Sequence, residues 1–168
     1  DVNSWKLASV PVGYKGYDFG RNNLKSGYNR AKLSWYSIDP IFYSYRSPDE
    51  ISADEISKNN TRRIYIDEIF PELDLYQGES RSQTTFDISF YPDEKGPYNN
   101  NTTDNFLSDK KNNWAAVTKS INTTNFKKAN VEYIQFWMLD DFEDYDSNEL
   151  EIGEIIFHLG NISEDILN

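Results

Sequence analysis

Cysteine is absent from this chain of 168 residues, and histidine and methionine occur once each. The absence of cysteine excludes disulfides, thiolate metal sites and cysteine nucleophiles. The single histidine, His158, is too few for a typical zinc site and gives no convincing catalytic triad. No apolar run approaches the ~20 residues that a membrane-spanning helix needs. We therefore expect a soluble domain that does not itself insert into a membrane.

Positive charge is also scarce, because 17 Lys and Arg residues stand against 28 Asp and Glu residues, a formal net charge of −11. Such a surface repels nucleic-acid phosphates and anionic lipid head groups, so we expect no nucleic-acid partner. Aromatic residues, in contrast, make up 15% of the chain. Rings bury large areas and favour strands, so the composition predicts a mostly β fold.

Apolar and polar residues alternate with period two in six segments, as expected for strands. These segments are residues 30–38, 84–91, 131–138 and 150–159 and, more weakly, 5–10 and 41–45. In the second segment, Phe86, Ile88 and Phe90 are predicted to face the core. Residues 131–138 are apolar on both faces, which predicts a central strand that is covered on both sides.

One helix is predicted to begin after Ser47, because Pro48 suits the first helical position and Glu50 completes a capping box. It should end near residues 59–60. Residues 62–70 are ambiguous and fit a strand that is broken at Glu68. Residues 95–113 read as a long loop. Strands separated by long loops predict a jelly-roll-like β-sandwich with one or two short helices in insertions. We expect a single domain over residues 1–168, cut from a larger protein.

The richest cluster of oxygen ligands is the acidic loop at residues 140–148, which suits Ca²⁺. Asp144, Asp146 and Asn148 match the opening of an EF-hand loop. The match then fails, because Glu149 replaces the required glycine and Ile155 replaces the bidentate glutamate. A loop-borne Ca²⁺ site and a solvated connection between strands both remain open. No other cofactor is expected.

A second candidate site is an aromatic platform formed by Tyr14, Tyr17, Phe19 and Tyr28. Such rings stack on sugars and on peptide side chains. The alternative, that they pack over the edge of the sandwich, is the one that the sequence favours. A hydrolase with paired carboxylates is a further alternative, but no pair of acids stands out by its spacing. We therefore predict no catalytic residues and no enzyme activity.

Six stretches, in order along nearly the whole chain, resemble the SprA family, also called Sov. They are residues 5–9 (WKLAS), 28–36 (YNRAKLSWY), 68–71 (EIFP), 112–115 (NNWA), 133–140 (YIQFWMLD) and 161–167 (NISEDIL). The family implies a very large outer-membrane β-barrel that serves as the translocon of the type IX secretion system in Bacteroidetes. That translocon exports folded cargo, including adhesins for gliding motility.

The resemblance implies that this chain is one soluble, non-catalytic insertion of the translocon and not barrel wall. Its strands are short and its loops are charged, unlike lipid-facing strands. The implied location is the outer membrane of a Gram-negative bacterium, with the domain on the extracellular or periplasmic side. The implied partners are the remainder of the barrel, secreted cargo and accessory lipoproteins. The chain departs from the family in residues 95–105 and 141–148. A carbohydrate-binding jelly-roll module is the alternative function.

Overall fold

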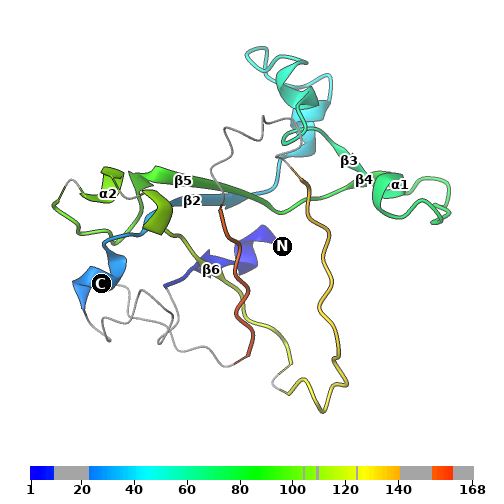
Figure 1. Ribbon diagram of the computed structural model, residues 1–168. Helices are drawn as coiled ribbons and strands as arrows, with labels where there is room; N and C mark the ends of the chain where they lie inside the picture. The colour runs from blue at the N-terminus through cyan, green and yellow to red at the C-terminus, as the bar shows by residue number, and fades with distance from the viewer. Residues whose placement is uncertain (10–22, 104, 109, 124, 141–152, 161–168) are drawn as a thin grey trace. The chain divides into compact units, whose positions relative to one another are not determined.

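A computed structural model describes residues 1–9, 23–103, 105–108, 110–123, 125–140 and 153–160 (Figure 1). Within these residues, six strands form three two-stranded sheets, and each of the two α-helices has four residues. The regular structure is therefore mostly β, as the composition predicts. Short 3-10 helices join these elements.

The chain divides into two compact units, and each unit is built from separate stretches of sequence. Unit 1 comprises Asp1–Trp35, Ile88–Val131 and Gly153–Asn168. Unit 2 comprises Tyr36–Asp87 and Glu132–Ile152. Each unit therefore depends on contacts between residues that are distant in the sequence.

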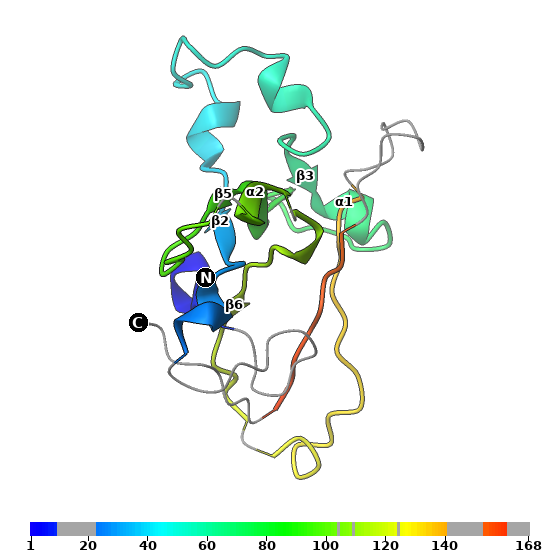
Figure 2. The same cartoon turned by 60° about the vertical axis from the view of Figure 1, so that its left-hand side comes forward.

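Unit 1 contains two of the sheets. Strand β1 (Lys6–Leu7) pairs antiparallel with β6 (Val117–Thr118), with Lys6 opposite Thr118. Strand β2 (Ala31–Tyr36) pairs with β5 (Asp87–Lys95), and the two lie side by side in both views (Figures 1 and 2). Tyr36, the last residue of β2, and Asp87, the first residue of β5, belong to unit 2. The predicted strands at 5–10, 30–38 and 84–91 are thus confirmed in position, with shorter or shifted ends.

A buried arginine lies at the centre of unit 1. Arg30 is only 2% exposed, and its guanidinium donates hydrogen bonds to Ser9 Oγ (2.9 Å) and to the Pro97 carbonyl (3.3 Å). The guanidinium carbon also lies 4.9 Å from the ring centroid of Trp114 and 5.9 Å from that of Tyr98. Because a buried cation is costly without polar partners, these contacts let Arg30 serve as a core residue.

The predicted loop at residues 95–113 is structured and contributes to the core. It contains helices α2 (Asn105–Ser108) and η5 (Lys110–Asn112). Phe106 is buried, and the Asn113 amide donates to the carbonyls of Phe106 (2.9 Å) and Pro92 (2.7 Å). Gly96 is required where this segment meets β2, because a Cβ there would come within 2.2 Å of the Ala31 carbonyl oxygen.

Unit 2 contains the third sheet and most of the irregular structure. Strand β3 (Ile64–Tyr65) pairs antiparallel with β4 (Ser82–Gln83), and helix α1 (Ile66–Ile69) follows β3 directly. The strand predicted over residues 62–70 is therefore confirmed only at Ile64–Tyr65, because Ile66–Ile69 form a helix. Two 3-10 helices, η3 (Pro40–Tyr43) and η4 (Glu55–Ser57), precede them, while η1 (Val2–Ser4) and η2 (Leu24–Gly27) belong to unit 1.

The predicted helix at residues 47–60 and the predicted strand at 41–45 are wrong. Turns and the short η4 occupy the first segment, and the reciprocal cap forms later, between Ser52 and Glu55. A helix over residues 47–60 would be stable only if it buried an apolar face against the rest of the unit. Ile51, which would belong to that face, is exposed. The second segment is η3, because the Asp39 carboxylate accepts from the Ile41 amide (2.8 Å) and Pro40 favours a helical start.

The predicted faces of two apolar segments are also wrong. In β5, Ile88 is 51% exposed and Phe90 is exposed, whereas Asp87 and Ser89 are half-buried. Residues 131–140 form no strand, and their large side chains from Val131 to Leu139 are exposed. Residues 153–159, the described part of the predicted strand 150–159, are likewise exposed and not in a strand. Alternation specifies an extended backbone, but only tertiary contacts decide which face is covered.

Candidate functional site

Most residues of the two predicted sites lie outside the described part of the chain. These are Tyr14, Tyr17 and Phe19 of the aromatic platform and Asp144, Asp146 and Asn148 of the Ca²⁺ loop. Tyr28 is described and is half-buried just after η2. Its carbonyl accepts from the Asn99 amide (3.1 Å) and the Asn101 amide (3.3 Å), so its backbone belongs to the structural centre of unit 1.

The described residues contain no group of three or more His, Asp or Glu side chains that could hold a metal ion. In the same residues, no helix is both long enough and apolar enough to cross a membrane. The described residues do present exposed aromatic side chains that could contact another molecule. Unit 2 offers two such surfaces, each centred on a highly exposed ring.

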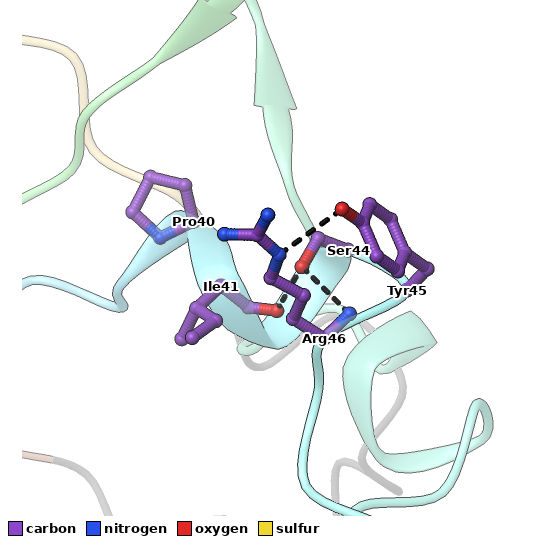
Figure 3. A pocket seen from close by; sticks show the side chains of 5 residues that line it. All are labelled: Pro40, Ile41, Ser44, Tyr45 and Arg46. Atoms are coloured by element: carbon purple, nitrogen blue, oxygen red, sulfur yellow. Dashed lines mark hydrogen bonds between the residues drawn. The ribbon is translucent and has the colours of Figure 1, made fainter.

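The first is a depression of about 430 Å³ beside η3 (Figure 3). It is lined by Pro40, Ile41, Ser44, Tyr45 and Arg46. The Ser44 hydroxyl donates to the Ile41 carbonyl (2.8 Å) and accepts from the Arg46 amide (3.1 Å). The hydroxyl is thus engaged in shaping the turn, and the ring and the guanidinium remain for a ligand.

Tyr45 and Arg46 form the exposed rim of this depression. Tyr45 is 89% exposed, and the Arg46 guanidinium carbon lies 5.3 Å from its ring centroid. The Arg46 Nε–H also donates to the Tyr45 hydroxyl (3.0 Å), and Figure 3 shows the two side chains turned toward each other. This arrangement suits contact with a partner molecule, because it offers a ring, a cation and apolar carbons on an open surface.

The second surface is the pair formed by Phe70 and Trp137. Their ring centroids are 5.9 Å apart and their planes meet at 86°, an edge-to-face contact. Phe70 is 48% exposed and Trp137 is 70% exposed. The pair joins two segments that are 67 positions apart in the sequence, so its geometry is not evident from any local pattern.

Helix α1 positions Phe70. The Tyr65 amide at its start donates to Glu68 Oε1 (3.0 Å), and Arg62 donates to Glu68 Oε2 (2.8 Å). These contacts lower the pKa of the Glu68 carboxyl, with the backbone bond from Tyr65 as the main cause and the bond from Arg62 as the second. At the helix end, the Phe70 amide donates to the Ile66 carbonyl (2.7 Å), which fixes the backbone that carries the ring.

Trp137 comes from the extended segment 131–140, which is tied to unit 2 near its end. The Asn59 amide donates to the Asp140 carbonyl (2.8 Å). The sequence marked this segment as apolar, but it did not show that the indole remains exposed against Phe70. The sequence interpretation therefore missed both surfaces. For the first surface a local signal exists, because Asp39 followed by Pro40 favours the start of η3.

The charge of the chain is concentrated in unit 2. Counted from the sequence, unit 2 has nineteen Asp and Glu residues and five Lys and Arg residues, a formal charge of −14. Unit 1 has nine acidic and twelve basic residues, a formal charge of +3. The exposed rings of unit 2 thus belong to its strongly acidic part.

No protein-family model matches this chain, and no curated protein matches it either. The resemblance to the SprA family therefore depends on the six ordered sequence stretches alone.

Proposed function

We propose that this chain is a non-catalytic structural and interaction domain of an outer-membrane protein-secretion translocon of the SprA type. The observation that carries the interaction role is the exposure of large rings on unit 2, above all Tyr45 and Trp137. Exposed apolar patches are uncommon on proteins that bind nothing, and they mark surfaces for other proteins. The ordered sequence stretches supply the proposed setting, type IX secretion and gliding motility.

In this setting the domain would brace or cap the pore, or contact secreted cargo and accessory lipoproteins. It would lie on the extracellular or periplasmic side of the outer membrane. We further propose that the mostly β fold is that of a jelly-roll-like sandwich. The antiparallel pairing of β1 with β6, two strands that lie far apart in the sequence, supports that arrangement.

The test is an in-frame deletion of residues 1–168 from the parent protein in its native host. We expect the barrel to remain in the outer membrane while cargo export and gliding decline. A matched strain that carries only Tyr45→Ser and Trp137→Ser separates loss of the surface from loss of the whole domain. Normal export and normal gliding in the deletion strain would contradict the proposal.

A carbohydrate-binding jelly-roll module is the second candidate function. The exposed rings favour it, because an open Trp or Tyr face can stack on a sugar ring. A glycan array probed with the wild-type domain and with Trp137→Ala tests it directly. Binding that is lost in the variant would support this function, and an array without any retained ligand would remove it.

The Ca²⁺ loop at Asp144, Asp146 and Asn148 needs its own test. Binding to the native state alone raises the melting midpoint, by an amount that grows with ligand concentration. A calcium titration followed by thermal melting, with the double variant Asp144→Asn and Asp146→Asn as control, separates a site from a solvated loop. A midpoint that calcium leaves unchanged would favour the solvated loop.

A further inference from the structure

We propose that the Phe70–Trp137 surface of unit 2 binds a basic segment of a partner protein, with a Lys or Arg side chain over the Trp137 indole. This surface is defined by the ring pair of Phe70 and Trp137. Exposed Leu73 and the carboxylates of Glu72 and Asp74 follow Phe70 closely in the sequence. The inference rests on the proposed interaction role and names the chemistry of the partner.

The first argument is that the indole is open and pre-oriented. Trp137 is 70% exposed, and its edge-to-face contact with Phe70 fixes the relative orientation of the two rings. Phe70 is held in turn by backbone bonds on both sides, since its amide donates to Ile66 and its carbonyl accepts from Leu73 (3.1 Å). A ring whose orientation is set before binding loses little conformational entropy when a ligand arrives.

The second argument is that other tryptophan rings of this chain already contact cationic side chains. The ammonium of Lys119 lies 5.8 Å from the ring centroid of Trp5, and the guanidinium of Arg30 lies 4.9 Å from that of Trp114. Among the described residues, Trp137 has no such cation within the chain. Since an indole is the best aromatic partner for a cation, this exposed ring is suited to a cation from another molecule.

The third argument is charge complementarity. Asp67 and Glu68 on α1 already form ion pairs, with Arg81 (3.5 Å) and Arg62 (2.8 Å). Glu72 and Asp74 are exposed and form no ion pair within the described part of the chain. The unit as a whole carries a formal charge of −14, so its field attracts a cationic segment and repels an anionic one.

These arguments favour a basic peptide over the other ligands that an exposed indole can take. Nucleic acid and anionic lipid are disfavoured by the sign of the charge. A neutral sugar would use the ring but not the carboxylates, so its binding would be insensitive to salt. Salt dependence therefore distinguishes the two.

The experiment uses the whole chain and two labelled probe peptides, one alternating Lys with Leu and one alternating Glu with Leu. Fluorescence anisotropy is measured at about 50 mM and about 500 mM salt. We expect the Lys peptide to bind at low salt, the Glu peptide not to bind, and affinity for the Lys peptide to fall at least about fivefold at high salt.

Two variants locate the site. Trp137→Ala should weaken binding of the Lys peptide about tenfold, and the pair Glu72→Gln and Asp74→Asn should weaken it about threefold and reduce the salt dependence. Tyr76→Ala is the matched control, because Tyr76 is a ring of the same unit that is even more exposed (81%) than Trp137. It should change affinity less than about twofold. Unchanged circular dichroism and melting midpoints establish that each variant is folded.

Equal binding of both peptides, or equal effects of Trp137→Ala and Tyr76→Ala, would overturn the inference. This failure is distinguishable from failure of the proposed function. If the peptide does not bind while deletion of the domain blocks export, only the inference fails. If the peptide binds as expected while the deletion strain secretes and glides normally, the site stands and the translocon role fails.

Discussion

Replacing Arg30 by alanine should remove the contacts that hold the centre of unit 1 together. The change eliminates the bonds to Ser9 and Pro97, each worth roughly 1.5–3 kcal/mol for a charged donor. It also removes the contact with the Trp114 ring, worth about 2 kcal/mol when desolvated. Part of this loss is offset, because the folded state no longer has to desolvate a guanidinium. We therefore expect the free energy of unfolding to fall by about 3–4 kcal/mol.

The assay is urea unfolding followed by circular dichroism, with thermal melting as a second measurement. For a chain of this size, each kcal/mol shifts the melting midpoint by about 2–4 °C, so Arg30→Ala should lower it by roughly 6–16 °C. Arg30→Lys keeps the charge, but an ammonium cannot donate to two acceptors and stack on a ring at the same time, as the planar guanidinium does. This variant should therefore lose about half as much free energy of unfolding as Arg30→Ala.

The matched control is Lys32→Ala, two positions further along β2. Lys32 pairs with Glu94 (2.6 Å) on an exposed surface, where an ion pair contributes little, so this variant should unfold close to the wild type. The reasoning would be refuted if Arg30→Ala lost less than about 1 kcal/mol, or if it unfolded like Lys32→Ala.

Three further predictions follow from single contacts. Gly96→Ala should destabilise the chain by at least about 2 kcal/mol in urea unfolding, because its Cβ would meet the Ala31 carbonyl; a neutral effect would mean that β2 and this turn do not approach as described. Glu68→Gln should flatten the acid limb of the stability profile. Because the pKa of Glu68 is lowered in the folded state, its carboxylate stabilises the fold at pH values above about 4.5, its ordinary pKa. This stabilisation is lost as the pH falls through the lowered pKa. Parallel pH titrations of the urea midpoint check this, and identical limbs would contradict it. Trp137→Ala should leave the melting midpoint within about 2 °C of the wild type, because an exposed ring contributes little to folding; a larger drop would show that the indole is a core residue.

The sequence predicted backbone conformation better than it predicted burial. Strand β2 lies inside the segment that alternation marked, and β5 overlaps the segment that begins at residue 84. The exposure of Ile88 and Phe90 could not be predicted, because alternation is symmetric and the covering contacts come from elsewhere in the chain. Arg30 was missed for the same reason. An arginine at the start of a strand resembles a surface residue until Ser9, Pro97 and Trp114 surround it.

The candidate site shows the same limit. The depression beside η3 follows from a local signal, since Asp39 and Pro40 together favour a helical turn. The Phe70–Trp137 pair has no local signal, because its two rings come from segments 67 positions apart. The concentration of charge in unit 2 is visible only once the interleaved boundaries of the units are known.

The interleaving also sets the order of events during synthesis. Strand β1 ends at Leu7, but its partner β6 begins at Val117, so this sheet cannot close until about 110 more residues have left the ribosome. At ~5–20 residues per second, that interval lasts roughly 5–20 s. As it proceeds, the rings of residues 28–91 emerge before Val117 and before the second segment of unit 2, Glu132–Ile152. A holding chaperone that favours aromatic, extended segments would have its main opportunity to act on this chain in that interval.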